Sequence, residues 1–234
     1  MASSSWRQFK AILRKDLVME FRTREMITSM GLYALLTMVV YQIALSEAGE
    51  ALDVRLVMPG LIWVAFIFMS LLGLNRSFVH EKDQGCIDAL LLSPVDRPVI
   101  YFAKFTGNLL FLLVVEALSL PVFAFLFLQG REGIANPIWL LGAVMFAASV
   151  GISGVGTLLA TMTVNTSGKD ILLAVVFVPL MYPLLTAAVG ATFAAVIGGP
   201  GSIETFWAWM AWIAGFDVIM LLVAFGLYEF VIGA

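Results

Sequence analysis

Cysteine and histidine are almost absent from this sequence of 234 residues, which contains only Cys86 and His80. One cysteine excludes an internal disulfide and any zinc or iron–sulfur site built from several cysteines. One histidine excludes the ligation of a metal or a haem by two histidines of this chain. The sequence also offers no Ser–His, Cys–His or metal-binding cluster, so we expect a non-catalytic protein with no cofactor of its own.

Charge is scarce as well. Only 12% of the residues are charged, whereas 62% are hydrophobic and the mean hydropathy is +1.01. A soluble domain has roughly a quarter of its residues charged. The composition therefore predicts an integral membrane protein that binds no nucleic acid.

The nucleotide-binding motif G-x-x-x-x-G-K-[ST] is missing too. The nearest stretch, NTSGKD at residues 165–170, ends in aspartate and lacks the earlier glycine. If ATP drives this protein, a separate chain must hydrolyse it.

Six apolar segments follow a polar and basic leader at residues 1–25. Each has the roughly 20 residues that an α-helix needs to cross about 30 Å of hydrocarbon. Helices are expected because backbone polar groups inside a bilayer must be satisfied internally. The predicted fold is one all-α membrane domain, residues 1–234, with spans at about 26–46, 56–75, 104–128, 137–163, 171–198 and 206–232.

The fifth segment contains Pro179 and Pro183 and ends in GATFAAVIGGPGS. This Gly and Pro content favours a span that ends near residue 189, followed by a re-entrant or surface hairpin over residues 190–205. A single kinked span is the alternative.

The distribution of Lys and Arg predicts the orientation. Alternate sides of the six spans hold 11 and 2 of these residues, and the poorer side has only Arg55 and Arg131. Lys and Arg gather on the cytoplasmic side of membrane proteins. Both termini are therefore expected in the cytoplasm.

The leader has the pattern of an interfacial amphipathic helix. Its apolar residues fall within about 120° at 100° per residue: Trp6, Phe9, Leu13, Leu17 and Phe21. Its basic residues off that stripe are available to anionic headgroups: Arg7, Arg14, Lys15 and Arg22. Lys10 and Glu20 intrude on the apolar arc, and a basic tail that only sets the topology is the alternative.

Two acidic residues, Glu116 and Asp217, fall well inside predicted spans. A charge at the bilayer centre costs about 2.5–3.5 kcal/mol on insertion scales. Each could line a substrate path or brace a helix interface, or could be a protonated carboxyl hydrogen-bonded to a neighbouring helix. No Lys or Arg lies at mid-membrane to pair with them, which argues against a proton antiporter.

The fourth segment carries small residues at helical spacing. Ala143, Ala147 and Gly151 recur every four residues, as do Ser149 and Ser153. Such spacing lets helix backbones approach closely, so it predicts a packing face.

The charged segment between the second and third spans, residues 80–98, is the most informative. Ile87, Leu90 and Leu91 have the spacing of a short amphipathic helix, which Pro94 and Pro98 are expected to end. Exposed leucines on a surface helix need either a partner or the lipid interface to cover them.

This segment resembles the cytoplasmic signature of ABC-2-type exporter permeases, in the order Glu81-x-x-x-Gly85-x-x-Asp88-x-Leu90-Leu91-Leu92-x-Pro94-x-x-Arg97, followed by Lys104. In that group the segment forms a coupling helix that docks on the ATPase subunit. Three longer stretches are similar to the haem exporter protein B family of cytochrome c maturation: LRKDLVMEFRTRE, IWVAFIFMSLLGLNRSF and LLLSPVDRPVIYFAKFTGNLLFLLVVE.

The resemblance implies contacts with the ATPase at Glu81, Gly85, Asp88, Leu90, Leu91, Pro94 and Arg97. Asp88 and Cys86 stand where related exporters often have Glu and Thr. The implied function is the permease subunit of an ABC transporter for haem handling in the bacterial inner membrane. The implied partners are the ATPase, a haem-handling membrane subunit, a small accessory membrane protein and a second permease copy, with any haem ligated by partners.

Two alternatives stay open. A generic ABC-2 permease that exports a drug, a lipid or a polysaccharide would share the charged segment. A membrane assembly scaffold would never couple to ATP.

Overall fold

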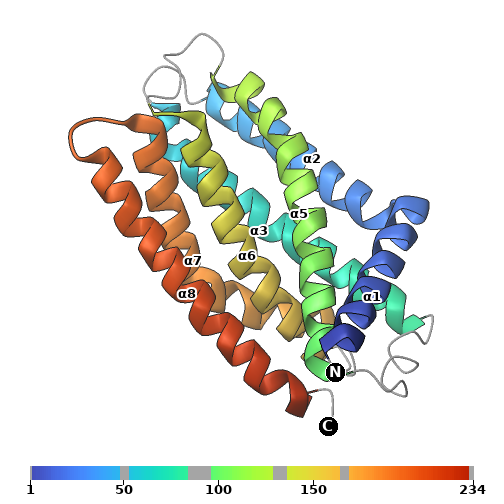
Figure 1. Ribbon diagram of the computed structural model, residues 1–234. Coiled ribbons are helices and arrows are strands. Elements are labelled where there is room, and N and C mark those ends of the chain that lie inside the picture. Colours follow the sequence, from blue (N-terminus) through green and yellow to red (C-terminus); the bar gives the residue numbers. More distant parts are fainter. Residues whose placement is uncertain (1, 48–52, 84–95, 129–135, 164–168, 232–234) are drawn as a thin grey trace.

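The computed structural model describes residues 2–47, 53–83, 96–128, 136–163 and 169–231. Every regular element in these ranges is an α-helix (Figure 1). The seven helices are α1 (Ala2–Thr23), α2 (Glu25–Glu47), α3 (Val54–Asp83), α5 (Arg97–Leu128), α6 (Ile138–Thr163), α7 (Lys169–Ile197) and α8 (Ser202–Val231).

Six of these helices, all except α1, are long and apolar enough to cross a membrane. The candidate spans are Glu25–Glu47, Val54–Asn75, Arg97–Phe127, Ile138–Met162, Leu172–Ile197 and Ser202–Leu227. The start of α1 and the end of α8 lie at the same end of the bundle (Figure 1), as an even number of spans requires. The predicted all-α membrane fold is confirmed, and the chain is a multi-pass membrane protein.

The third span begins earlier than predicted. α5 is helical from Arg97 rather than from about residue 104. Pro98, expected to separate the charged segment from the span, instead lies in the first turn, where its missing N–H needs no helical partner. The carbonyl of Asp96 accepts hydrogen bonds from the amides of Val99 and Ile100 at 2.9 and 3.4 Å, so Asp96 starts the helix.

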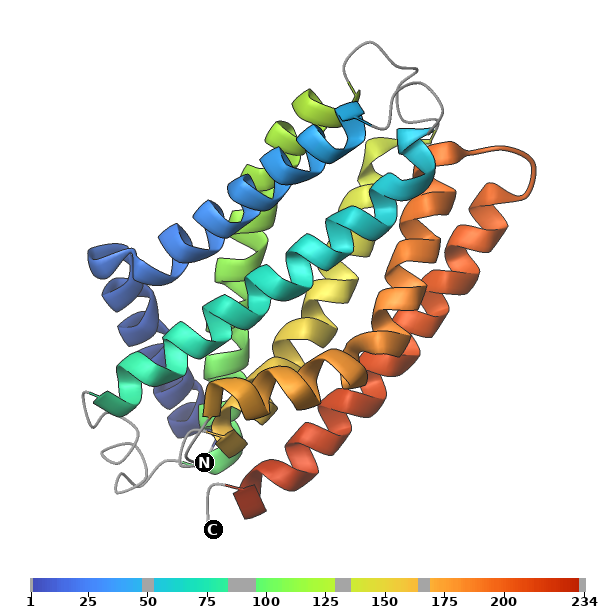
Figure 2. The same cartoon turned by 180° about the vertical axis from the view of Figure 1, so that it is seen from behind.

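The prediction of a hairpin over residues 190–205 is wrong. α7 is one helix from Lys169 to Ile197 and contains both Pro179 and Pro183. Figure 2 shows that this helix is bent. A proline inside a helix removes a backbone hydrogen bond and kinks it, so the alternative of a single kinked span is the one that forms.

Gly190 shows why the composition was misleading. The indole of Trp209 on α8 packs directly on Gly190, where any Cβ would collide with the ring. The neighbouring Ala191, Thr192 and Ala195 are buried. These small residues belong to a helix-packing face rather than to a loop.

The connection between α7 and α8 is a short turn that contains three glycines in the left-handed region. Gly198, Gly199 and Gly201 have φ values of 69°, 110° and 75°. Glycine adopts this conformation without a steric penalty. The turn lies at the end of the bundle opposite to the start of α1 (Figure 1).

α6 is the central helix of the bundle and contacts α3, α5, α7 and α8. Residues 151–160 of this helix, which include Ser153, are all buried, and so is Ser149. The predicted packing face of the fourth segment is therefore used within this chain. The flanking α2 and α8 leave large apolar residues such as Leu36 and Leu222 exposed, as lipid-facing helices do.

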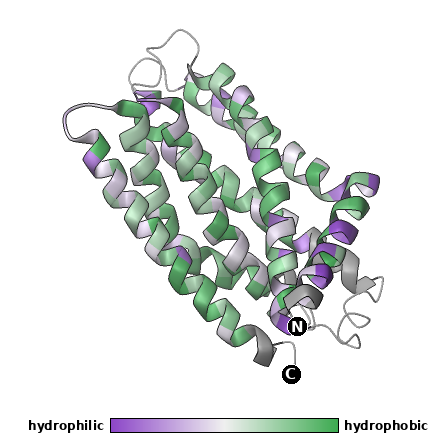
Figure 3. Cartoon of the chain, in the orientation of Figure 1, coloured by the Kyte–Doolittle hydropathy of each residue, from purple (hydrophilic) through white to green (hydrophobic). Residues whose placement is uncertain are grey.

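α1 crosses the ends of the spans instead of running alongside them (Figures 1 and 2). It packs against α5 and contacts α2. Hydrophilic residues gather on α1, whereas the spans are hydrophobic along most of their length (Figure 3). The predicted N-terminal amphipathic helix is thus present.

Candidate coupling site and intramembrane polar contacts

The predicted coupling segment connects α3 to α5. α3 continues to Asp83, so Glu81 belongs to an extension of the second span rather than to a separate short helix. Arg97 is the exposed first residue of α5. The other predicted contacts lie outside the described residues, and their role stays a prediction: Gly85, Asp88, Leu90, Leu91 and Pro94.

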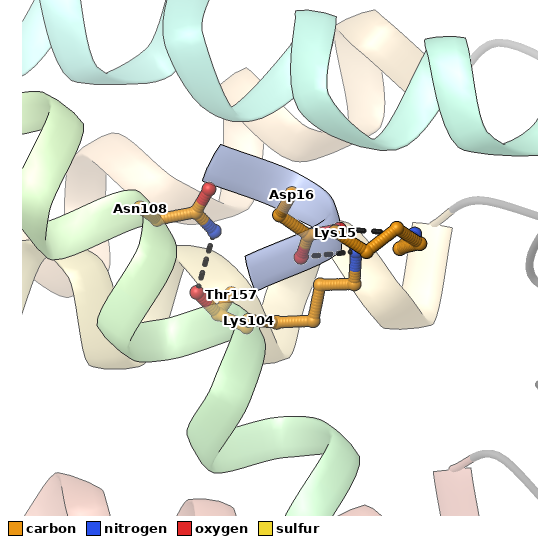
Figure 4. Close-up of polar contacts among 5 residues, drawn as sticks. All are labelled: Lys15, Asp16, Lys104, Asn108 and Thr157. Carbon is orange, nitrogen blue, oxygen red and sulfur yellow. Dashed lines mark hydrogen bonds and ion pairs between the residues drawn. The ribbon is translucent and has the colours of Figure 1, made fainter. Parts of the chain in front are cut away.

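The first turns of α5 are attached to α1. Lys104 Nζ donates a hydrogen bond to Asp16 Oδ2 at 2.8 Å (Figure 4). Lys15 Nζ lies 2.9 Å from the other carboxylate oxygen, Asp16 Oδ1. Nearer the start of α1, Ser5 Oγ donates to Asp96 Oδ2 at 3.4 Å. The contacts of Asp16 with Lys104 and of Ser5 with Asp96 therefore hold α1 to the beginning of the third span.

The pair of Lys104 and Asp16 is shielded from solvent. The Lys104 side chain is 4% exposed and that of Asp16 is 12% exposed. Lysine is almost never so buried unless it is paired, and removal of one partner leaves an uncompensated buried charge. Lys104 lies about two turns after Arg97, so the pair fixes α1 close to the predicted coupling segment.

The bend between α1 and α2 depends on Glu20. Its Oε1 accepts a hydrogen bond from the amide of Ile27 at 2.9 Å. This amide lies in the first turn of α2, where backbone N–H groups have no intrahelical partner and favour a negative charge. Arg24, with a φ of 57°, makes the bend itself. Glu20 interrupts the apolar stripe of the leader because it caps the next helix.

α5 is also linked to the central helix α6 near the same end. Asn108, four residues after Lys104, donates through Nδ2 to Thr157 Oγ1 at 2.9 Å (Figure 4). The Tyr101 hydroxyl donates to the carbonyl of Gly154 at 3.0 Å. The side chains of Tyr101, Asn108 and Thr157 are buried. The start of α5 is thus connected to α1 and to α6 at once.

Glu116 lies farther along the interface between α5 and α6. Ser149 Oγ lies 2.8 Å from both Glu116 Oε1 and Glu116 Oε2. The single hydrogen of the Ser149 hydroxyl is therefore shared between the two carboxyl oxygens, which both accept it. Both side chains are buried. Glu116 therefore braces a helix seam through a hydrogen bond to a neighbouring helix.

Asp217 lies at the junction of α6, α7 and α8. Its carboxylate packs on Gly151 of α6, beside Leu184 of α7. Asp217 Oδ1 is buried and has no hydrogen-bond partner among the described residues. Ser149 and Gly151 are two residues apart and so lie on nearly opposite faces of α6. This helix therefore separates Asp217 from Glu116, and the two acids do not form one site.

Metal ligands do not gather in the part of the chain that the structure describes. There, no three His, Cys, Asp or Glu side chains come close enough to hold an ion. What the contacts around Lys104 provide is a mechanical connection between a surface helix and two spans.

Comparison with known proteins identifies the family of this chain. Residues 7–230 match the model of the family described as CcmB protein. The chain belongs to this family. It is similar to heme exporter protein B of Pseudomonas aeruginosa, with 26% identity over 199 residues that cover 85% of this chain and 86% of the relative. Heme exporter protein B of Escherichia coli K12 is 26% identical over 187 residues, with 80% and 82% covered. The resemblance found in the sequence is confirmed.

The sequence of this CcmB-family protein did not predict the contact between Lys104 and Asp16. Lys104 was expected as the residue that follows the signature and begins a span, without a contact to another helix, and Asp16 was not singled out. A partial signal was present, because Lys104 and Asn108 place two polar side chains on one face of an apolar helix. Nothing local indicates that the partner of Lys104 lies 88 positions earlier in the chain.

Proposed function

We propose that this chain is the membrane permease subunit of an ABC transporter complex for haem handling in c-type cytochrome maturation. The match to the CcmB family over residues 7–230 carries this proposal. Relatives that bear the name heme exporter protein B support haem as the cargo. The six candidate spans supply the body of such a permease.

In this proposal a separate cytoplasmic ATPase hydrolyses ATP, because the chain has no P-loop. The ATPase docks on residues 81–97, with Leu90 and Leu91 facing it. α3 and α5 lead away from the two ends of that segment. A partner docked there therefore acts on two spans at once.

The contacts of α5 supply a route for the movement. A displacement of the start of α5 reaches α1 through Lys104 and Asp16, and it reaches α6 through Asn108 and Thr157. Burial of these side chains supports the route, because a packed contact moves as a unit instead of yielding to water.

Haem is the cargo in this proposal, and partner proteins ligate it. His80 is the only histidine of the chain, and the positive-inside rule puts it on the cytoplasmic side. A haem at the outer face therefore takes its histidine ligands from a haem-handling membrane subunit. A small accessory membrane protein and a second permease copy complete the complex, in the bacterial inner membrane with both termini cytoplasmic.

Deletion of this chain tests the haem role. Cells without it are stained for covalent haem in c-type cytochromes, and a copy of the wild-type chain is restored as the control. We expect the cytochromes to disappear on deletion and to return on restoration. Normal cytochrome levels in the deletant would exclude haem handling and leave a permease for another substrate.

A paired substitution tests the docking segment. Leu90→Asp/Leu91→Asp is expected to leave the chain in the membrane but to abolish co-purification of the ATPase and covalent haem staining. Leu90→Val/Leu91→Val keeps both positions apolar and should preserve both readouts. Retention of the ATPase by the aspartate variant would refute docking at this segment, and a wild-type chain that captures no ATPase would favour a scaffold.

A further inference from the structure

Three residues that face the protein set how α1 is turned about its own axis. Ile12 and Glu20 are buried, and Asp16 between them is paired with Lys104. Because they are spaced by four residues, they lie along one stripe of the helix. This stripe decides which residues of α1 point away from the bundle.

Both acidic residues of α1 lie on the inward stripe, where Asp16 pairs with Lys104 and Glu20 caps α2. The opposite side carries Arg7, Arg14 and Arg22, all of them exposed. At 100° per residue these three arginines fall within about 80° of each other. Within the described ranges, no carboxylate pairs with them. The outward face of α1 therefore carries positive charge without compensation.

An exposed aromatic band borders the arginines. Trp6 and Phe21 are 58% and 67% exposed, and Lys10 Nζ lies 4.9 Å from the centre of the Trp6 ring. Aromatic rings beside cations are typical of helices that lie in the membrane surface. α1 crosses the ends of the spans (Figures 1 and 2), so this band runs along the edge of the bilayer.

We infer that α1 carries a binding surface for anionic phospholipid headgroups, formed by Arg7, Arg14 and Arg22. A guanidinium group binds phosphate oxygens through two parallel hydrogen bonds. The adjacent rings favour lipid over an acidic protein surface, because they need the apolar part of the interface to cover them. Each cation close to an anionic membrane surface raises the affinity about fivefold.

Lipid selection by the purified full chain tests this surface. The chain is given equal amounts of phosphatidylglycerol and phosphatidylcholine with the same acyl chains, and bound lipids are counted by native mass spectrometry. We expect enrichment of phosphatidylglycerol that weakens with added salt. The Arg7→Gln/Arg14→Gln/Arg22→Gln variant should lose about fivefold of this enrichment for each arginine removed.

Two matched variants keep the result interpretable. Arg7→Lys/Arg14→Lys/Arg22→Lys retains the charge and should keep most of the enrichment. Arg55→Gln removes a cation that lies outside α1, 3.6 Å from Asp53, and should change nothing. Because the three arginines are exposed, thermal unfolding in phosphatidylcholine alone should be equal for the wild-type chain and the two triple variants.

Two results would overturn the inference. One is equal binding of the two lipids by the wild-type chain, and the other is unchanged enrichment in the glutamine variant. If the glutamine variant with unchanged enrichment also no longer captures the ATPase, the arginines belong to an acidic protein surface instead.

Discussion

The ammonium group of Lys104 lies 2.8 Å from the carboxylate of Asp16, although the two residues are 88 positions apart in the chain. The pair joins α1, which crosses the ends of the spans, to the helix that follows the predicted coupling segment. Because both groups are largely buried, salt screens their attraction far less than that of an exposed pair. In the proposed mechanism α1 therefore moves together with the third span.

Breaking this pair from one side should destabilise the protein more than removing it. Among the described residues, Lys104→Met leaves Asp16 with Lys15 as its remaining partner, and it should cost about 3 kcal/mol of unfolding free energy. Asp16→Leu/Lys104→Met removes both charges and should recover most of that loss. Unfolding in detergent, followed by circular dichroism, measures the two values.

The same variants separate stability from coupling. If the pair transmits movement, the stable double variant should still show reduced stimulation of the ATPase in the assembled complex. A double variant that is no more stable than Lys104→Met would contradict the expected recovery.

Glu116 should tolerate replacement of its carboxyl by an amide but not the loss of its hydrogen bond. Glu116→Gln keeps an acceptor and a donor for Ser149, so we expect near wild-type stability and covalent haem staining. Glu116→Leu leaves the buried Ser149 hydroxyl without this partner and should cost about 1–3 kcal/mol. If Glu116→Gln abolished activity at normal abundance, an ionisable carboxyl on a transport path would be required instead.

Gly151 should resist substitution because the carboxylate of Asp217 occupies the space where a Cβ would lie. Gly151→Ala is expected to cost about 1–3 kcal/mol through overpacking. Gly142 lies on the same helix, and no atom of the other described helices lies within 4 Å of the place that a Cβ would take. Gly142→Ala should therefore be neutral or stabilising by up to about 1 kcal/mol. Thermal unfolding of the two variants checks the contrast, and similar shifts would disprove it.

The carboxylate of Glu20 should hold the bend between α1 and α2. Glu20→Ala removes the acceptor for the Ile27 amide and should cost about 1 kcal/mol, as the loss of a helix cap does. Glu20→Gln retains an oxygen acceptor and should lose less. Hydrogen exchange of the Ile27 amide reports the effect directly, and equal protection in both variants would contradict the assignment.

The spans were predictable because each is a long apolar run in a chain with few charges. That pattern depends on hydrocarbon thickness alone and needs no knowledge of neighbouring helices. The failure at residues 190–205 has the opposite cause. Gly190 indicates a break locally, but in the bundle it provides room for the ring of Trp209 from the next helix.

The candidate site likewise has features that the sequence could predict and features that depend on neighbouring helices. The charged order from Glu81 to Arg97 is a local pattern, so the sequence was enough to suggest a coupling segment and a family. Glu116 and Asp217 were recognisable as unusual because charge is costly at mid-bilayer. Their separate surroundings, at Ser149 and at Gly151, were not predictable, because both depend on which helices lie beside α6.

By itself, then, the sequence determined an all-α membrane protein with six spans, an amphipathic leader and membership of a permease family. Hydropathy and motif order are properties of consecutive residues, which is why they were sufficient. Only the tertiary structure decided that Asp16 turns inward to Lys104 and that Glu20 caps α2. Both contacts need helices to pack in three dimensions, and they leave the arginines of α1 on its outer face.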